Sequence, residues 1–414
     1  MKDVVIIGGG IVGLWCAWHL QQAGRQVTII DKSNFKDGCS FGNAGMIVPS
    51  HFIPMASPGI IATGIRWMFK KDSPFYIRPR LNLELAQWLF LFYKSASRKH
   101  VDESVCLLRD MHEESRELYR HVNQIPGFQF DFQQRGILML YKSQGAEKDE
   151  METAEKAHEL GIKANQLTPD QLKQIEPGID LSVKGAIHYP GDAHLIPQVF
   201  MQQMKGFLEQ SGVEFIHDSE VVDIDEQGSS GAYVSILNKE KLHARNVVIT
   251  AGSWSGKLMR KSGFRLPMQD GKGYSMTISN PPFKPSIPSI LHEARVAITP
   301  MGSDLRISGT LEISGMDDRV NQHKVDSILR AVPDYYPQLK VNDPGPVWYG
   351  YRPCTPDGLP YIGRWKEGSS VIIATGHAMM GLSLAPVTGR MTADILTGKE
   401  TSNPSSKLNP SRFS

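Results

Sequence analysis

The stretch "WYGYRPCTPDGLPYIG" (Trp348–Gly363) places one basic residue, Arg352, among prolines and aromatic residues. A guanidinium stays charged, so in such a loop it needs an anionic partner. It can hold a carboxylate through two parallel hydrogen bonds. The sequence therefore predicts that Arg352 binds an anion, either the carboxylate of a ligand or an acidic side chain in a structural ion pair.

A phosphate-binding pattern opens the chain. In "DVVIIGGGIVGLWCAWHLQQAGRQVTIID" (Asp3–Asp31), an apolar strand is followed by a glycine-rich turn, a helix expected over Ile11–Gln22 and a strand expected over Val27–Ile30. The turn has the form GxGxxG, with Gly8, Gly10 and Gly13. These glycines let a pyrophosphate approach the backbone and the start of the helix, and Asp31 is placed to accept hydrogen bonds from a ribose. The pattern predicts dinucleotide binding but does not by itself separate NAD from FAD.

A loop of small residues follows the second strand. "CSFGNAGMIVP" (Cys39–Pro49) includes Ser40, Gly42, Ala44 and Gly45. Because these side chains are small, the backbone can lie close against a ring system, as a flavin requires. An ordinary surface loop can have the same composition.

Four motifs together resemble the FAD-dependent D-amino acid dehydrogenases, which belong to the larger group of D-amino acid oxidase, glycine oxidase and sarcosine oxidase. They are the glycine fingerprint, SxxNAG from Ser40 to Gly45, the segment Ser57–Arg80, and RPxTPDGxPxIG from Arg352 to Gly363. The resemblance covers almost the whole chain, although residues 100–180 match only in layout. It implies an α/β fold, in which a Rossmann-type, glutathione-reductase-like FAD-binding domain is joined to an α+β substrate domain built on an antiparallel sheet.

The resemblance also implies that both domains are discontinuous in sequence. Residues 1–57, 192–262 and 345–414 are expected to form the FAD-binding domain, and residues 58–191 and 263–344 the substrate domain. Alternating apolar and polar residues in "GKGYSMTI", "RVAITPMG" and "LRISGTLEISG" predict the antiparallel strands of the substrate domain. Two further segments are predicted to face solvent, the charged helix Val101–Asn123 and the polar tail Thr401–Ser414.

The resemblance further implies, residue by residue, where FAD is held. The expected contacts are Gly8, Gly10, Ile11, Val12, Gly13, Asp31, Lys32, Ser40, Asn43, Ala44, Gly45, Met46, Val221, Ala251, Gly252, Gly376, His377, Met380, Gly381 and Leu382. Sarcosine oxidases attach the flavin through a cysteine at the position of Gly350, and the nearby Cys354 is displaced from that position. The FAD is therefore expected to be non-covalent.

In the resembled family, Arg352 has the role of gripping the substrate carboxylate. The implied reaction is oxidation of a D-amino acid to an imino acid that water hydrolyses to a 2-oxo acid. The hydride passes from Cα to flavin N5, and a small acceptor such as a quinone or another electron carrier takes the electrons. Side chains that could share the carboxylate or accept the ammonium proton are Tyr274, Tyr349, Tyr351, His51 and His292, although each could instead be a core or surface residue. Ala297 and Met379 replace a tyrosine and an arginine of glycine oxidase, which argues against glycine as substrate.

Two alternatives stay open. With the same fold and arginine, the chain could act as a dehydrogenase or oxidase of a secondary amine, or of D-proline with or without a ring hydroxyl. It could also be the flavoprotein subunit of a heteromeric amine dehydrogenase that passes electrons to a partner subunit. A nicotinamide-dependent dehydrogenase is disfavoured, because the sequence carries no second nucleotide fingerprint.

Composition narrows the class of partner. The 414 residues include 45 basic and 43 acidic ones, a balance that gives no reason to expect nucleic acid. The four cysteines form no CxxC pair, so we expect free thiols, a reducing compartment and no metal. The uncharged run Val4–Leu20 is broken by glycines and lacks a cleavage site, so it is not expected to be a signal peptide or membrane span. We therefore expect a cytoplasmic protein, or one that contacts the inner face of the cell membrane through "GIRWMFKK" (64–71) and "WLFLFY" (88–93).

Overall fold

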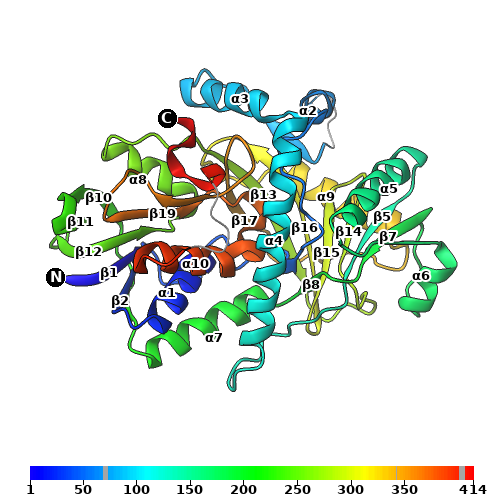
Figure 1. Ribbon diagram of the computed structural model, residues 1–414. Helices are drawn as coiled ribbons and strands as arrows, with labels where there is room; N and C mark the ends of the chain where they lie inside the picture. The colour runs from blue at the N-terminus through cyan, green and yellow to red at the C-terminus, as the bar shows by residue number, and fades with distance from the viewer. Residues whose placement is uncertain (69–72, 342, 401–405) are drawn as a thin grey trace.

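Two β-sheets organise the chain, and Figure 1 shows them side by side with helix α4 (Arg98–Val122) crossing in front of the region between them. The structure is a computed structural model that describes residues 1–68, 73–341, 343–400 and 406–414. The end of "GIRWMFKK", from Phe69 to Lys71, and the start of the tail, Thr401–Ser405, therefore lie outside the described residues.

The first sheet has the strand order β10-β11-β12-β1-β2-β9, with β19 beside β12 and β18 beside β19. Its strands are β1 (Lys2–Ile7), β2 (Val27–Ile30), β9 (Glu214–Ile216), β10 (Val221–Glu226), β11 (Ala232–Ile236), β12 (Leu242–Ile249), β18 (Tyr361–Arg364) and β19 (Val371–Thr375). The central strands β1, β2, β12 and β19 are parallel, and each contains a run of buried, mostly apolar residues. Such runs suit strands covered on both faces. Here α1, α7 and α10 cover one face, while α8 packs against the other.

The second sheet has the order β17-β13-β16-β15-β14-β5-β7-β6, with β4 beside β16. Its strands are β4 (Phe75–Ile77), β5 (Ile137–Tyr141), β6 (Asn165–Leu167), β7 (Gly185–Tyr189), β13 (Gln269–Ile278), β14 (Ser289–Leu291), β15 (Val296–Met301), β16 (Asp304–Ile313) and β17 (Trp348–Cys354). Most neighbours are antiparallel, as the alternating sequence patterns predict, and β14–β5 and β16–β4 are parallel. A short pair, β3 (Met46–Ile47) and β8 (Ala193–His194), links the small-residue loop to the chain ahead of α7.

The helices are α1 (Ile11–Gln22), α2 (Ile60–Met68), α3 (Leu83–Ser95), α4, α5 (Gln144–Glu159), α6 (Pro169–Ile175), α7 (Pro197–Gln210), α8 (Ser255–Lys261), α9 (Gln322–Tyr335) and α10 (Gly381–Thr397). Polar side chains set several of their starts: Asn82, Ser97, Ser143 and Thr168 each accept a hydrogen bond from a first-turn amide of α3, α4, α5 and α6. Gly398 ends α10 in the left-handed conformation with φ of 73°. Among the described residues, no helix combines the length and apolar character needed to cross a membrane.

The chain changes sheets close to the loop that carries Arg352. The expected domain boundary at residue 345 falls just before β17, yet β17 pairs with β13 in the second sheet. The chain then crosses to the first sheet, where β18 pairs with β19. Arg352 therefore lies in the second sheet, immediately before this crossing.

Helix α4 is not the solvated helix that its many charges predict. One face is buried and packs against α10. The buried positions include Val101, Val105, Leu108, Met111, Ser115 and Tyr119, which recur at intervals of three or four residues. This spacing forms an apolar stripe, and the charges occupy the opposite face.

The end of the tail is also packed rather than frayed. Arg412 forms an ion pair of 2.7 Å with Asp357, and both side chains are less than a tenth exposed. Asp357 belongs to the RPxTPDGxPxIG loop, so the C-terminal residues brace the loop that follows Arg352. Two hydrogen bonds join the guanidinium to the carboxylate. Such close contact offsets the free energy that both charged groups lose when they leave water.

Candidate active site

The carboxyl ends of β1 and β2 face a cavity of about 1730 Å³ whose wall also includes residues of β13, β15, β16 and β17. Ligand sites of α/β sheets form at this edge, because the strand-to-helix turns there leave backbone amides free to face a ligand. The cavity therefore joins the dinucleotide fingerprint to Arg352 in one space.

Most residues expected to hold FAD lie in the cavity wall. They are Gly8, Gly10, Ile11, Val12, Asp31, Lys32, Ser40, Asn43, Ala44, Met46, Val221, Ala251, Gly252, His377, Met380, Gly381 and Leu382. Gly13, Gly45 and Gly376 lie behind the wall, where neighbouring chain leaves no room for a side chain. A Cβ on Gly13 would lie 2.0 Å from the carbonyl oxygen of Gly8, and one on Gly45 would lie 2.4 Å from that of Leu195.

Asp31 ties the glycine turn to the second strand. Its carboxylate accepts hydrogen bonds from the amide of Gly9 at 2.6 Å and from the amide of Ser33 at 2.9 Å. Ser40 holds the end of the glycine turn that leads into α1, since its hydroxyl accepts a hydrogen bond of 3.2 Å from the amide of Ile11 in the first turn of that helix. The turn is thus held in shape by two side chains that also face the cavity.

Arg306 of β16 fixes the small-residue loop from the opposite sheet. Its guanidinium donates to the carbonyl oxygens of Phe41 at 3.1 Å and Asn43 at 2.8 Å. Asn43 in turn accepts a hydrogen bond from the amide of Gly45 at 2.9 Å. Arg306 is not among the site residues predicted from the sequence, although a single arginine inside the apolar strand "LRISGTLEI" is a signal that it has buried partners.

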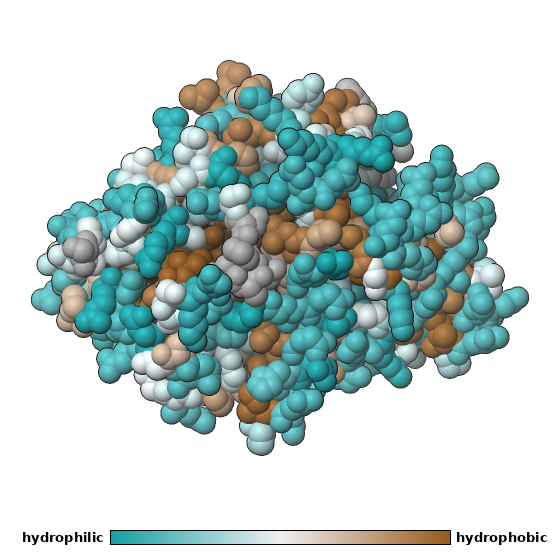
Figure 2. Space-filling model, viewed as in Figure 1, coloured by the Kyte–Doolittle hydropathy of each residue, from teal (hydrophilic) through white to brown (hydrophobic). Residues whose placement is uncertain are grey.

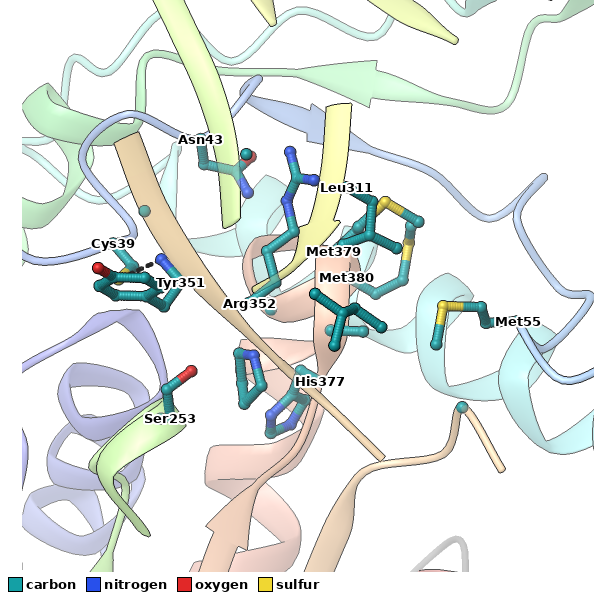
Figure 3. Close-up of a pocket in the computed structure, with 18 of the residues that line it drawn as sticks. Cys39, Asn43, Met55, Ser253, Leu311, Tyr351, Arg352, His377, Met379 and Met380 are labelled. Atoms are coloured by element: carbon teal, nitrogen blue, oxygen red, sulfur yellow. Dashed lines mark hydrogen bonds between the residues drawn. The ribbon is translucent and has the colours of Figure 1, made fainter. Parts of the chain in front are cut away.

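Arg352 extends from β17 into the space that the labelled side chains surround in Figure 3. Its guanidinium donates to the carbonyl oxygen of Thr310 on β16. Within the described ranges, no carboxylate forms an ion pair with it. Burial lowers the pKa of this guanidinium, and only the thiols of Cys354 and Cys39 act in the opposite direction. The guanidinium of Arg352 is thus a desolvated cation in the cavity wall, and its acceptor is the neutral carbonyl group of Thr310.

Gly273 provides the space in which the guanidinium lies. It faces Gly350 across the β13–β17 pair, and a Cβ built on it would lie 2.3 Å from Nη2 and 2.4 Å from Cζ of Arg352. Gly273 is not among the site residues predicted from the sequence. Glycine inside a strand often marks the close approach of another group, and "GKGYS" carries that signal.

Gly273→Ala should lower kcat/KM by about 10- to 100-fold, because an added methyl group displaces the end of a flexible side chain by 1 Å or more and misplaces its ligand. Bound cofactor and thermal unfolding should change little, since the backbone of Gly273 does not have the positive φ that strains other residues. Steady-state kinetics and a melting curve measure the two effects. In an Arg352→Ala background the same change should add almost nothing, and an additive loss would show that Gly273 acts by another route.

His51 lies in the cavity wall beside a polar pair. Its Nδ1 is 3.0 Å from the hydroxyl of Ser50, and that hydroxyl donates to Asp192 at 2.5 Å. Desolvation lowers the pKa of His51 to about 4, with Glu150 opposing the shift and Arg295 reinforcing it. The imidazole is therefore neutral near pH 7 and can accept a proton.

The tyrosines proposed from the sequence are placed less favourably. Tyr349 is outside the cavity wall, and its hydroxyl donates to Asp318 at 3.2 Å. The hydroxyl of Tyr351 donates to the same carboxylate at 2.9 Å. Tyr274 contributes to the wall, but its hydroxyl accepts from the amide of Asn321 at 3.1 Å within the core. His292 reaches the wall with Nδ1 2.6 Å from Glu150. Arg352 and His51 also line the cavity, and among the described residues Nη2 of Arg352 and Nε2 of His51 have no hydrogen-bond partner.

Comparisons with known proteins cover nearly the whole chain. The family model described as "FAD dependent oxidoreductase" matches residues 3–395. The chain is similar to the D-amino acid dehydrogenase of Helicobacter pylori, with 29% identity over 395 residues that cover 95% of this chain and 94% of that protein. It is also similar to the D-amino acid dehydrogenase of Vibrio vulnificus (strain CMCP6), with 30% identity over 412 residues and 97% of each chain covered.

Two solved structures resemble it in fold. Glycine oxidase from Geobacillus kaustophilus has a TM-score of 0.80 at 23% identity, over 99% of this chain and 98% of that one. L-proline dehydrogenase from P. horikoshii has a TM-score of 0.75 at 22% identity, over 100% and 97% of the two chains. At these identities the likeness concerns the fold alone.

Proposed function

We propose a D-amino acid dehydrogenase activity for this chain, which belongs to the family of FAD-dependent oxidoreductases. The reaction oxidises a D-amino acid to a 2-oxo acid and passes the electrons to a quinone or another acceptor. The observation that supports it most is Arg352, a desolvated guanidinium that faces the cavity and has no carboxylate partner among the described residues. Reduction of the bound flavin by D-amino acids without oxygen tests it.

FAD is the cofactor, and the cavity suits it. The start of α1 lines the cavity with its backbone amides. Asp31, at the end of β2, and Val221, at the start of β10, also line it. The loop from Gly42 to Ala44 adds backbone with small side chains to the wall. We propose that the seventeen wall residues named above hold the cofactor, with Gly13, Gly45 and Gly376 shaping the turns behind them. When bound, FAD supplies an acceptor for a hydride.

The protein's own part in the reaction is to bind and orient the substrate. Arg352 can hold the substrate carboxylate through two hydrogen bonds, since Thr310 occupies only one of its donors. Fixing the carboxylate restricts the directions that the Cα hydrogen can take, and such orientation is the main requirement for hydride transfer. His51, neutral near pH 7, can accept the proton that the substrate ammonium must lose.

A substrate panel separates this proposal from its rivals. D-proline, hydroxy-D-proline and sarcosine test the secondary-amine alternative, because they carry the same carboxylate on an N-substituted amine. The heteromeric alternative is tested by activity of the isolated chain after gel filtration. Turnover of secondary amines alone, or activity only in a complex, would replace the proposal with the corresponding rival.

The FAD should be released intact by acid or heat, leaving colourless protein. Gly350 stands where sarcosine oxidases carry the linking cysteine, and burial raises the pKa of the Cys354 thiol to about 12. The pKa of Cys39, the cysteine of the cavity wall, is also raised by burial. Both thiols therefore stay protonated and weakly nucleophilic. An absorbance spectrum of the supernatant after acid precipitation measures the release, and yellow precipitate would mean covalent attachment.

We further propose that α2 and α3 contact a membrane surface, where a lipid-soluble acceptor is available. Exposed apolar side chains gather there and include Ile65, Leu81, Leu83, Phe90 and Tyr93, with exposures from 54% to 110%. Figure 2 shows the hydrophobic colour over these two helices at the top of the molecule. The inner faces of α2 and α3 also form part of the cavity wall, so a lipid contact would lie beside the cavity.

Phe90→Asp should reduce sedimentation with anionic lipid vesicles several-fold, because it removes apolar area and adds a charge that anionic headgroups repel. Phe283→Asp serves as the matched control, since Phe283 is 43% exposed in a different part of the chain. Equal binding of both variants, or none by the unaltered protein, would contradict the proposed contact.

The two-domain division also stays a proposal, with residues 1–57, 192–262 and 345–414 forming the cofactor domain. The strands of the first sheet support it, since β1, β2, β9–β12, β18 and β19 all fall in those segments. The position of β17 in the second sheet suggests a boundary nearer residue 355 than 345.

A further inference from the structure

A chain of hydrogen bonds leads from the cavity wall into the protein interior through His51, Ser50 and Asp192. The distances are 3.0 Å from His51 Nδ1 to Ser50 Oγ and 2.5 Å from Ser50 Oγ to Asp192 Oδ2. The amide of Ser50 also donates to Asp192 Oδ1 at 3.1 Å. His51 forms part of the wall, whereas Asp192 is only 1% exposed. Three polar side chains are thus aligned from the cavity wall into the interior.

We propose that His51, Ser50 and Asp192 form a relay that carries the ammonium proton of the bound substrate to the Asp192 carboxylate. The proposal rests on the proposed function, because it needs an amine substrate in the cavity. It assigns Asp192, rather than His51, as the place where the proton is stored.

Each step of the relay balances. The ammonium gives one proton to Nε2 of His51, and Nδ1 of the same ring gives its proton to the hydroxyl of Ser50. That hydroxyl gives its own proton to Asp192, so each of the three transfers breaks one bond to hydrogen and forms one. The result is a neutral amine, a neutral carboxylic acid and a His51 ring that remains neutral in its other tautomer. No oxidant or further reactant is needed.

The surroundings explain why the proton stops at Asp192. Desolvation raises the pKa of Asp192 to about 7; Arg116 opposes this shift through its charge, and Glu113 reinforces it. His51 faces Glu150 of α5, the charge of Arg295 and the buried His112 of α4, and desolvation keeps its pKa near 4. A ring with so low a pKa is a poor store for a proton but can pass one along. A carboxylate that titrates near pH 7 can hold it.

A spectroscopic titration tests the acceptor without any substrate. Difference infrared spectra of the FAD-loaded protein should show a buried carboxylic acid band with its midpoint at about pH 7, apart from that of Asp270, whose pKa burial raises to about 6. Asp192→Asn should remove the band at about pH 7 and leave the other in place. The relay is wrong if the band with its midpoint at about pH 7 persists in Asp192→Asn, or if the unaltered protein shows no band with that midpoint.

A kinetic titration tests the proton path. The acceptor must be ionised, so the rate of anaerobic flavin reduction in the unaltered protein should rise as the pH rises through about 7. Asp192→Asn and Ser50→Ala should each reduce that rate by about 100-fold or more at pH 7. At an alkaline pH where free substrate already carries a neutral amine, both variants should approach the unaltered rate. Ser50→Thr keeps the hydroxyl and should restore most of the rate.

Ser383→Ala is the matched control. Its hydroxyl accepts from the amide of Val48 at 2.9 Å and lies 2.8 Å from His112, so it belongs to the same buried region but not to the relay. It should leave the pH profile unchanged. If Ser50→Ala and Asp192→Asn lower the rate equally at every pH, they act structurally and the relay is wrong. If the infrared band behaves as expected but no amino acid reduces the flavin, the proposed function fails while the acceptor state of Asp192 stands.

Discussion

Arg352→Ala should lower kcat/KM for the best D-amino acid by about thirty- to several-thousand-fold. A carboxylate that enters this cavity loses water, and the guanidinium replaces the lost hydrogen bonds. Removing one partner of such a desolvated pair costs about 2–5 kcal/mol, and each 1.4 kcal/mol is about a factor of ten in rate. The absorbance spectrum of bound FAD should hardly change, because Arg352 is not among the residues proposed to hold the cofactor. Steady-state kinetics with a range of amino acid concentrations measure the effect.

Two further variants identify the cause of that loss. Arg352→Lys should recover only part of the activity, since an ammonium cannot make the planar pair of hydrogen bonds. Arg80→Ala removes another arginine of the cavity wall, whose Nη2 already donates to Gln269 at 2.7 Å, and should have a much smaller effect. If Arg352→Ala keeps near-normal kcat/KM while Arg80→Ala does not, the carboxylate site is at Arg80.

Lowering the pH from 7 to 5 should remove about 5 kcal/mol of folding stability. Desolvation lowers the pKa of His19, His51 and His194 to about 4 and that of His112 and His377 to about 3. In the unfolded chain these histidines take up protons at about pH 6.5, whereas in the folded protein they stay neutral down to a lower pH. The free energy of unfolding therefore falls by about 2 kcal/mol for each histidine between pH 7 and pH 5. Asp192 and Asp270 act in the opposite direction, because burial raises their pKa values to about 7 and about 6. The folded protein therefore takes up these two protons as the pH falls to 5, which offsets about 3–4 kcal/mol of the loss.

Urea unfolding at the two pH values measures the difference. A loss of this size compares with the whole stability of an ordinary domain, which is about 5–15 kcal/mol. His194→Gln removes one buried site and should reduce the pH-dependent loss by about 2 kcal/mol. His217→Gln changes an exposed histidine and should leave it unaltered. Equal stability at pH 7 and pH 5 would show that the histidines are protonated in the folded protein.

The fingerprint region could be predicted from sequence because its signals are local. The β-branched runs, the three spaced glycines and Asp31 each constrain neighbouring backbone, and α1 and β2 occupy the expected Ile11–Gln22 and Val27–Ile30. The same holds for β13, β15 and β16, whose alternation reflects one buried face and one facing the cavity.

Features that depend on distant partners could not be read in this way. The burial of α4 depends on α10, almost three hundred residues later, and its charges hid the apolar stripe. Tyr349 and Tyr274 were proposed for their hydroxyl groups, but only the fold shows that these bond to Asp318 and to the amide of Asn321. The guanidinium of Arg352 packs over Gly273 only because β13 and β17 pair in one particular register, which no local pattern specifies.

Anaerobic mixing of the purified, FAD-loaded protein with single amino acids tests the central claim most directly. The flavin absorbance near its visible maximum is followed after addition of a D-amino acid or its L-enantiomer. We expect D-amino acids to bleach the flavin and their L-enantiomers to leave it oxidised. Handedness is fixed by three directions, those of the carboxylate, the amine and the Cα hydrogen, and Arg352 is proposed to set the first of them. Bleaching by L-amino acids at an equal rate, or no bleaching by any D-amino acid or D-proline derivative, would contradict the proposed activity.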